Sequence, residues 1–222
     1  MGLKTRMKNQ KESAKIYHIT HIDNLPKIIS DGCLWSDRAR LVRGFDCNLI
    51  GMPAIKNRRL NLIPVPCHPG TTVGDYVPFY FCPRSVMLYI FHCNNHPDLP
   101  YRGGQQPIVH LQADLHACVD WANRKRVRFA FSNGNAGSLT ADFFSELSDL
   151  SQINWAAIDS TDFRDRTVKE QKQAEFLVHE SFPWSLVESL GVFDKNICDL
   201  ARRVISDCTH KPLVRVENSW YF

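Results

Sequence analysis

The 222-residue sequence lacks the features that mark several large classes of protein. No apolar run approaches the roughly 20 residues that a membrane-spanning helix requires, so we expect no membrane segment. The first fifteen residues are polar and basic with no apolar segment after them, which is not the pattern of a secretory signal peptide. A cytoplasmic protein is therefore expected.

The eight cysteines are not arranged as a metal site or as a disulfide framework. No two of them are spaced as Cys-x-x-Cys, and the nearest cysteine–histidine neighbours are adjacent residues, which is not the spacing of zinc ligands. Without a secretory signal, reduced and mostly buried thiols are the better interpretation. We expect no bound metal.

Several nucleotide-binding and hydrolase motifs are also missing. The chain contains no Gly-x-Gly-x-x-Gly fingerprint and no Walker loop, so neither a Rossmann dinucleotide site nor P-loop hydrolysis is supported. It contains no Gly-x-Ser-x-Gly nucleophile elbow either. Any nucleotide chemistry must therefore use a different kind of site.

What the chain does have is the composition of a globular protein, with 44% hydrophobic and 23% charged residues. We find no internal repeat, low-complexity tract or Gly/Ser linker that would divide it. Residues 1–15 are predicted to be a flexible basic leader, and residues 16–222 a single domain. The net charge of +4 is too small to indicate a nucleic-acid partner.

Short apolar runs separated by turn residues predict an α+β fold around a mostly antiparallel sheet. The expected strands are 16–19, 76–82, 108–111, 127–131, 174–178 and 213–216. The expected helices are 24–30 (capped by Asp23 and ended by Gly32), 85–91, 139–150 and 197–208. Residues 48–73 and 94–107 are expected to be long loops, and Pro78 predicts an edge strand or an irregular strand start.

Basic residues are clustered rather than spread evenly, and the stretch 129–163 contains no lysine or arginine at all. Such clusters fit contacts with phosphate groups, although ordinary solvated faces remain the alternative. The clusters are Arg38/Arg40/Arg43, Lys56/Arg58/Arg59, Arg124/Lys125/Arg126/Arg128 and Arg164/Arg166/Lys169/Lys172.

Two polar residues stand out in strand-like segments. Glu175 is surrounded by apolar neighbours, and a buried carboxylate is costly unless it is paired, so it is either catalytic or held structurally by an amide or an arginine. His18 lies in another short strand with Thr20 on the same face. A lone strand histidine is more often structural than functional.

Five segments taken together resemble the DarT family of DNA ADP-ribosyltransferase toxins. They occur in the family's order and extend over roughly residues 16 to 180, and Val86 stands where the family usually has proline. The segments are 17–20 (YHIT), 55–59 (IKNRR), 75–89 (DYVPFYFCPRSVMLY), 131–136 (FSNGNA) and 172–178 (KQAEFLV).

This resemblance implies an ADP-ribosyltransferase fold, a split antiparallel sheet with peripheral helices that grips NAD in a cleft. His18 and Thr20 would bind NAD, Tyr80 would lie beside the nicotinamide, and Glu175 would be the catalytic glutamate. Arg58 would be the arginine beside it, at both the NAD and the catalytic site, although the adjacent arginine leaves the register open. Residues expected near the target DNA are Arg84, Met87 and Arg59.

The implied activity is transfer of ADP-ribose from NAD to a base of single-stranded DNA, thymine rather than guanine, as the toxin of a toxin–antitoxin pair. The implied partner is a macrodomain antitoxin of the DarG type. A base inside a duplex cannot be reached, which favours a single strand. The alternatives are an enzyme of the same fold acting on RNA or protein, and a non-catalytic nucleic-acid-binding domain in which Glu175 is structural.

Overall fold

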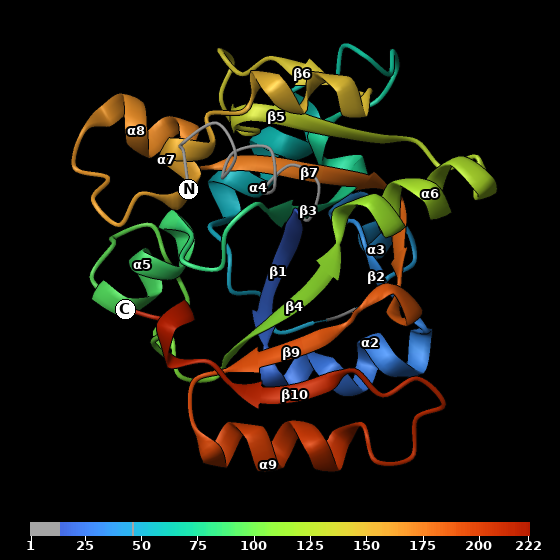
Figure 1. The fold of residues 1–222 in the computed structure, drawn as a ribbon, viewed down its shortest axis with the longest axis vertical. Coiled ribbons are helices and arrows are strands. Elements are labelled where there is room, and N and C mark those ends of the chain that lie inside the picture. Colours follow the sequence, from blue (N-terminus) through green and yellow to red (C-terminus); the bar gives the residue numbers. More distant parts are fainter. Residues whose placement is uncertain (1–13, 46) are drawn as a thin grey trace, which may run out of the picture.

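A mixed sheet forms the centre of the protein in the computed structural model, which describes residues 14–45 and 47–222 (Figure 1). In this part of the chain eight strands pair in the order β10-β9-β4-β1-β3-β7-β5-β6, and β2 and β8 form a separate ribbon. All pairs are antiparallel except β9 with β10. The strands are β1 (Lys15–His21), β2 (Cys33–Trp35), β3 (Tyr76–Tyr80), β4 (Ile108–Asp114), β5 (Phe129–Asn135), β6 (Phe143–Phe144), β7 (Ala174–His179), β8 (Ser181–Pro183), β9 (Ser189–Val192) and β10 (Leu213–Val216).

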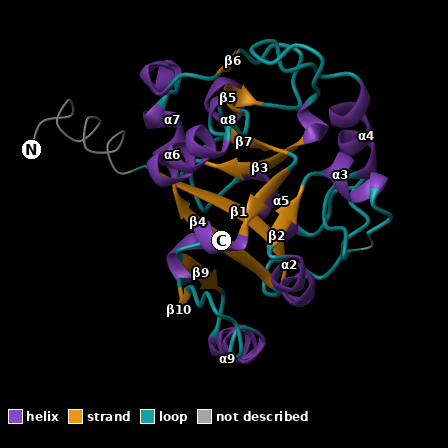
Figure 2. Cartoon of the chain, turned by 90° about the vertical axis from the view of Figure 1, so that its right-hand side faces the viewer, coloured by secondary structure: helices purple, strands orange, loops and turns teal. Residues whose placement is uncertain are grey.

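Helices cover the sheet on both sides. Figure 2 shows α3 and α4 on one side of it and α6 and α7 on the other. The helices are α2 (Leu25–Asp31), α3 (Asp37–Val42), α4 (Pro53–Asn61), α5 (Val86–Cys93), α6 (Leu115–Lys125), α7 (Trp155–Asp159), α8 (Arg166–Gln171) and α9 (Lys195–Val204). Within the described residues, none of these helices has the length and apolarity needed to cross a membrane.

The sheet is nearly split between β1 and β3, which pair only at Tyr17 and Tyr80. Pro78 explains the gap. Its carbonyl oxygen accepts a hydrogen bond from the His18 ring, on the side of β3 that faces β1. In a strand, the N–H of a residue points to the same side as its own carbonyl. Because proline has no N–H, it cannot continue the ladder to β1. The edge strand or irregular strand start expected from Pro78 was wrong, because β3 lies between β1 and β7 and Pro78 is in its middle. The proline is tolerated there because its side towards β1 has no strand pairing.

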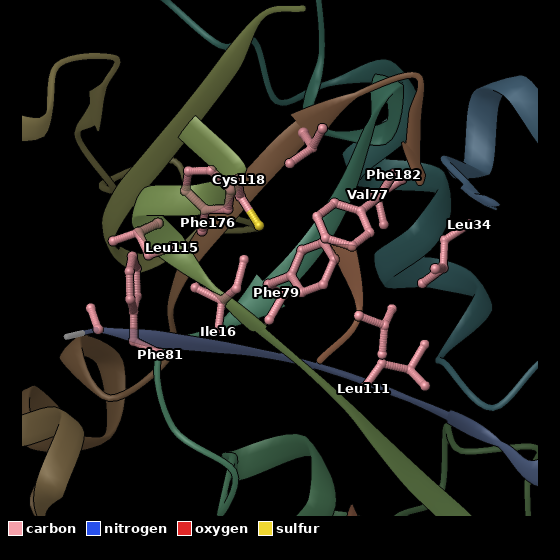
Figure 3. Close-up of a cluster of buried hydrophobic side chains, with 14 of the residues drawn as sticks. Ile16, Leu34, Val77, Phe79, Phe81, Leu111, Leu115, Cys118, Phe176 and Phe182 are labelled. Carbon is pink, nitrogen blue, oxygen red and sulfur yellow. The ribbon is translucent and has the colours of Figure 1, made fainter. Parts of the chain in front are cut away.

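The main hydrophobic core packs under the sheet and holds the strands of the two halves together (Figure 3). Phe79 of β3 and Phe182 of β8 lie with ring centroids 4.5 Å apart, and Phe176 of β7 is fully buried beside them. Burying such rings removes large apolar areas from water, each contributing about 2–3 kcal/mol. The core therefore fixes β3 and β7 relative to each other, and with them the polar residues these strands carry.

Most sequence-predicted elements exist, but several predictions were wrong. The expected loop 48–73 contains the helix α4, and the expected helix 139–150 is instead the short strand β6 followed by a 3-10 helix, Leu147–Gln152. Asp23 does not cap α2, whose first turn has no side-chain cap, whereas Gly32 does end it in a left-handed conformation with φ of 69°. Residues 1–13 of the expected leader lie outside the described residues, and the rest differs because Ala14 is buried and Lys15 begins β1.

Candidate active site

Three polar side chains come from three consecutive strands of the sheet. His18 lies on β1, Tyr80 on β3 and Glu175 on β7, and Tyr80 is directly opposite Glu175 in the β3–β7 pairing. Residues directly opposite each other project to the same face of an antiparallel pair, so Tyr80 and Glu175 are neighbours on that face. The three residues that sequence analysis selected are therefore brought together across the split in the sheet.

A cleft of about 260 Å³ opens beside these strands, between the sheet and the helices α2, α3, α4 and α5. His18, Thr20 and Tyr80 line it from the sheet, Arg59 from α4 and Met87 from α5. The walls thus combine apolar and aromatic surface with a few polar groups, which is typical of a small-molecule site.

Glu175 is held behind this cleft by an ion pair with Arg59. Its side chain is 3% exposed, and its two carboxylate oxygens accept hydrogen bonds of 2.9 and 2.7 Å from the two terminal nitrogens of Arg59. The backbone N–H of Ala136 donates a third, longer bond of 3.3 Å. Burial lowers the pKa of the Arg59 guanidinium, but the charge and hydrogen bonds of Glu175, with the nearby Tyr80 and Asp37, together outweigh this, so the pKa lies above its ordinary value. The guanidinium is therefore charged at neutral pH.

The segment 132–137 supports this carboxylate from the other side. The backbone N–H of Glu175 donates to the Ser132 hydroxyl, which in turn donates to the carbonyl of Gly134. The register of β5 and β7 shifts between Phe131 and Asn135, so the β5 backbone bends here. This bend brings the Ala136 N–H to the carboxylate, which explains why a turn-like sequence lies next to a strand carboxylate.

The arginine beside Glu175 is Arg59 and not Arg58, which corrects the assignment made from the sequence. Arg58 is exposed, lies against Gly137, and makes no side-chain hydrogen bond within the described residues. Arg59, which the resemblance placed near the DNA, instead lines the cleft and binds Glu175. Adjacent residues on a helix differ by about 100° in direction, so the correct one could not be chosen before the position of α4 was known.

His18 lines the cleft, and among the described residues only its Nδ1 has a hydrogen-bond partner. Its Nδ1 lies 2.8 Å from the carbonyl oxygen of Pro78, and because a carbonyl only accepts, Nδ1 must carry the proton. Burial lowers the pKa of His18 below its ordinary value, so the ring is neutral at pH 7 and Nε2 is an acceptor. Burial also raises the pKa of Tyr80, with the nearby Glu175 charge adding to the effect, so its hydroxyl stays protonated.

Thr20 and Arg84 lie in different places relative to the cleft. The Thr20 hydroxyl accepts a 3.0 Å hydrogen bond from Asn24, which also bonds the backbone of Asn48 and so joins β1 to the loop at the rim of the cleft. Arg84 does not line the cleft. It lines a neighbouring pocket of about 150 Å³, with its guanidinium 4.3 Å from the ring of Phe222, and its Nε has no partner among the described residues.

The structure also adds Asp37, which sequence analysis did not name, and places Arg40 and Lys56, which it named only as members of basic clusters. Asp37 and Arg40 of α3 and Lys56 of α4 line the cleft together. The sequence signal was an acidic residue, Asp37, directly before the basic cluster of α3. It indicates a site only when α3 and α4 are known to face each other. Other members of the clusters are structural, since Arg38 pairs with Asp75 and Arg43 with Glu180. The described residues bring no group of three or more His, Cys, Asp or Glu together as a metal site.

Comparison with known proteins gives one consistent result. Residues 17–222 match the family described as "ssDNA thymidine ADP-ribosyltransferase, DarT". A DNA ADP-ribosyl transferase of Thermus sp. (strain 2.9) is 36% identical over 95% of this chain and 97% of its own. A solved structure of Thermus sp. 2.9 DarT in complex with ADP-ribosylated ssDNA superposes with a TM-score of 0.86, at 34% identity over 95% of this chain and 97% of the other.

Two further matches bear on ligands and partners. The structure of Thermus sp. 2.9 DarT in complex with NAD+ has a TM-score of 0.79 and 33% identity, covering 95% of this chain and 98% of the other. A fusion of a DNA ADP-ribosyl transferase with a DNA ADP-ribosyl glycohydrolase from Thermosipho africanus is 24% identical over 87% of this chain and 46% of its own length. On the family match and the identity to its members, this chain belongs to the DarT family of single-stranded DNA thymidine ADP-ribosyltransferases.

Proposed function

We propose that this protein transfers ADP-ribose from NAD to a thymine base of single-stranded DNA, with Glu175 as the catalytic carboxylate. The observation that carries the proposal is that His18 and Tyr80 line one cleft from adjacent strands, while Glu175 lies opposite Tyr80 on the next strand and is bonded to Arg59, which lines the same cleft. Burying a carboxylate costs free energy, so a buried glutamate that is ion-paired with an arginine beside such a cleft is a candidate catalytic group.

The cleft offers NAD the contacts that its sugars and nicotinamide need. The neutral His18 ring has an acceptor, Nε2, for a ribose hydroxyl, and Thr20 follows two residues later on the same strand, close to the nicotinamide amide. Tyr80 supplies a ring face against which the nicotinamide packs.

Glu175 acts on the ribose from which nicotinamide leaves. When the bond between C1″ and the nicotinamide nitrogen breaks, the electron pair stays on nicotinamide and positive charge develops on the sugar. A carboxylate near the 2″-hydroxyl stabilises this charge, and the effect is larger in a dry site. Among the described residues Oε2 of Glu175 accepts only from Arg59, so its second lone pair can accept from the sugar while Arg59 remains bound.

The base then forms the new bond to C1″. The only N–H of a thymine base in DNA is at N3, and its proton must be removed as the bond forms, a transfer that Glu175 can assist. Arg59 fixes the carboxylate during this step and is therefore the active-site arginine in place of Arg58. A base within a duplex cannot reach the cleft, which favours single-stranded DNA.

The DNA strand approaches from the side of α5. Met87 lines the cleft from this helix, and Arg84 lies just before it at the pocket that Phe222 also lines. A guanidinium next to aromatic rings suits a nucleic-acid strand, since phosphates bind the cation and bases stack on rings. These two residues are the proposed contacts to the target strand.

A macrodomain antitoxin of the DarG type is the proposed partner, and the cytoplasm is the proposed location. The relative in which transferase and glycohydrolase are fused supports the pairing of modification with its reversal. The substrates NAD and single-stranded DNA are both found in the cytoplasm of a bacterium.

Mass spectrometry of single-stranded oligonucleotides that differ in one base tests the proposal. Incubation with NAD should add one ADP-ribose only to oligonucleotides that contain thymine. Glu175→Gln keeps the side-chain volume but removes the charge, and it should lower the rate at least about 100-fold while NAD still binds. Glu188→Gln is the matched control, because Glu188 is an exposed carboxylate paired with Lys15, and its rate should be unchanged.

Other outcomes would point to the alternatives. If oligonucleotides stay unmodified while RNA or a protein gains ADP-ribose, the acceptor is a different class of molecule. If the protein binds DNA but neither binds nor consumes NAD, Glu175 is structural and the domain is not catalytic.

A further inference from the structure

An ion cluster of three residues crosses the cleft between α3 and α4. The Lys56 ammonium lies 2.7 Å from Oδ1 of Asp37, and a terminal nitrogen of Arg40 lies 3.5 Å from the same oxygen. The side chains of Lys56 and Arg40 are 27% and 14% exposed, so the cluster is largely shielded from solvent. Burial raises the pKa of the Asp37 carboxyl, but the charge and hydrogen bond of Lys56 together with the charges of Arg40 and Arg59 outweigh it, so the pKa lies below its ordinary value and the carboxyl is ionised.

This cluster holds the unbalanced positive charge of the cleft. Among the described residues that line it, Lys27 is paired with Asp31 at 2.5 Å, and Arg59 is paired with Glu175. Asp37, in contrast, faces two cations. A surplus positive charge inside a partly enclosed cleft favours an anionic ligand group at that point.

The cluster is also close to both groups that are proposed to hold the sugars of NAD. The charges of Lys56 and Asp37 act on the His18 ring, and the charge of Asp37 acts on the Arg59 guanidinium that binds Glu175. All of these side chains except Glu175 line the same cleft. In NAD the diphosphate joins the two riboses, so a molecule that reaches from His18 to Glu175 must place its diphosphate near Lys56.

We propose that Lys56 and Arg40 bind the diphosphate of NAD. This inference rests on the proposed function, since it assumes that NAD occupies the cleft. Among the described residues the Lys56 ammonium uses one of its three hydrogen-bond donors, and that bond goes to Asp37. Two donors therefore remain for phosphate oxygens, while Asp37 keeps the side chain extended across the cleft.

Gly51 helps to place the lysine. A Cβ built on Gly51 would lie 2.9 Å from Cε of Lys56, so the lysine stem passes directly over the glycine backbone. Any larger residue at this position would push the ammonium away from its present place. The close approach of the Lys56 side chain to the backbone of residue 51 therefore depends on glycine at this position.

Binding of ADP-ribose, measured by isothermal titration calorimetry, tests the inference because ADP-ribose retains the diphosphate. Lys56→Met should weaken binding about tenfold or more, the usual loss for a hydrogen bond to a charged group. Lys56→Arg keeps the charge and should restore most of the affinity. Lys125→Met is the matched control, since it removes one positive charge from the exposed end of α6 and should leave affinity unchanged.

Kinetics and salt dependence separate a phosphate contact from a general structural defect. In Lys56→Met the KM for NAD should rise while the KM for the oligonucleotide is unchanged. Affinity for ADP-ribose should fall with added salt in the parent protein and fall less steeply in Lys56→Met. Gly51→Ala, which moves the lysine without removing its charge, should shift the KM for NAD in the same direction.

Two results would overturn the inference, and they differ from failure of the proposed function. If Lys56→Met and the parent protein bind ADP-ribose within about twofold of each other and with the same salt dependence, Lys56 does not contact the diphosphate. If Lys56→Met weakens binding but Lys56→Arg is equally weak and both melt at a lower temperature, the lysine is structural. If the parent protein binds neither NAD nor ADP-ribose, the proposed function itself fails.

Discussion

Replacing Arg59 by methionine is the sharpest test of how this site is built. Arg59 makes two hydrogen bonds to Glu175, and the Glu175 side chain is only 3% exposed. Methionine preserves much of the apolar stem but removes the guanidinium. The carboxylate would then be buried with the Ala136 N–H as its remaining hydrogen-bond donor. Arg58→Met on the same helix changes an exposed side chain and is the natural control.

The expected loss of stability follows from the burial of the pair. Removing one partner of a buried ion pair costs about 3–5 kcal/mol because it leaves an uncompensated charge. The Arg59 side chain is 14% exposed and lines the cleft, so water can reach the vacated space, and we expect the lower end, about 3 kcal/mol. For a chain of this size that corresponds to a fall in Tm of about 6–12 °C.

Thermal unfolding and a rate measurement check this expectation together. Arg59→Met should also lower the rate of ADP-ribose transfer at least about 100-fold, because an unpaired buried carboxyl favours its neutral form and loses its fixed position. Arg59→Lys should recover only part of the rate, since an ammonium cannot make the two parallel hydrogen bonds. Arg58→Met should change the free energy of unfolding by less than about 0.5 kcal/mol.

The reasoning is refuted if Arg59→Met melts within about 2 °C of the parent protein. It is equally refuted if Arg58→Met abolishes activity while Arg59→Met does not. In that event the pairing of Arg59 with Glu175 would not exist in the working enzyme, and the original assignment of Arg58 would be restored.

The remaining predictions concern pH and packing. Burial lowers the pKa of His110 to about 4, whereas an unfolded histidine titrates near 6.5, so the unfolded state binds this proton first. The free energy of unfolding should therefore fall as the pH drops from about 6.5 to 4, with His110 contributing about 3 kcal/mol. In urea unfolding, the difference in the free energy of unfolding between the parent and His110→Gln should become smaller as the pH falls over this range. A difference that stays constant would contradict the expectation. A Cβ on Gly191 would lie 2.2 Å from the Trp220 ring, so Gly191→Ala should cost about 1–3 kcal/mol, and an unchanged Tm would show that the ring moves freely.

Much of the sheet could be predicted because its strands are locally distinctive. The run 174–178 is apolar apart from Glu175, which is typical of a strand buried on both faces, and it forms most of β7, an interior strand between β3 and β5. The segment 139–150 misled the prediction, since its spaced apolar residues suit a helix but Phe143 and Phe144 pair with β5 instead. Tertiary pairing overrode the local pattern there.

The helix α4 was hidden for a related reason. It has no buried residue, and it is held largely by polar contacts, Lys56 to Asp37 and Arg59 to Glu175 among them. A helix without an apolar face gives no periodic signal in the sequence. Its surrounding prolines made a loop the natural prediction, although a proline at the first helical position in fact begins it.

The amino-acid sequence alone determined the chemistry available to the site, because a carboxylate in an apolar strand and a histidine in another are local properties of the chain. It also identified the family, because five short sequence segments occur in the same order as in the family. Only the tertiary structure decided that Arg59 is the arginine that binds Glu175, and that Asp37, Arg40 and Lys56 line the same cleft as Arg59. These contacts join residues as far as 116 positions apart, and their geometry depends on how α3 and α4 dock on the split sheet. The direction of a side chain on a docked helix is a property of the packed molecule, and no neighbouring residue in the chain encodes it.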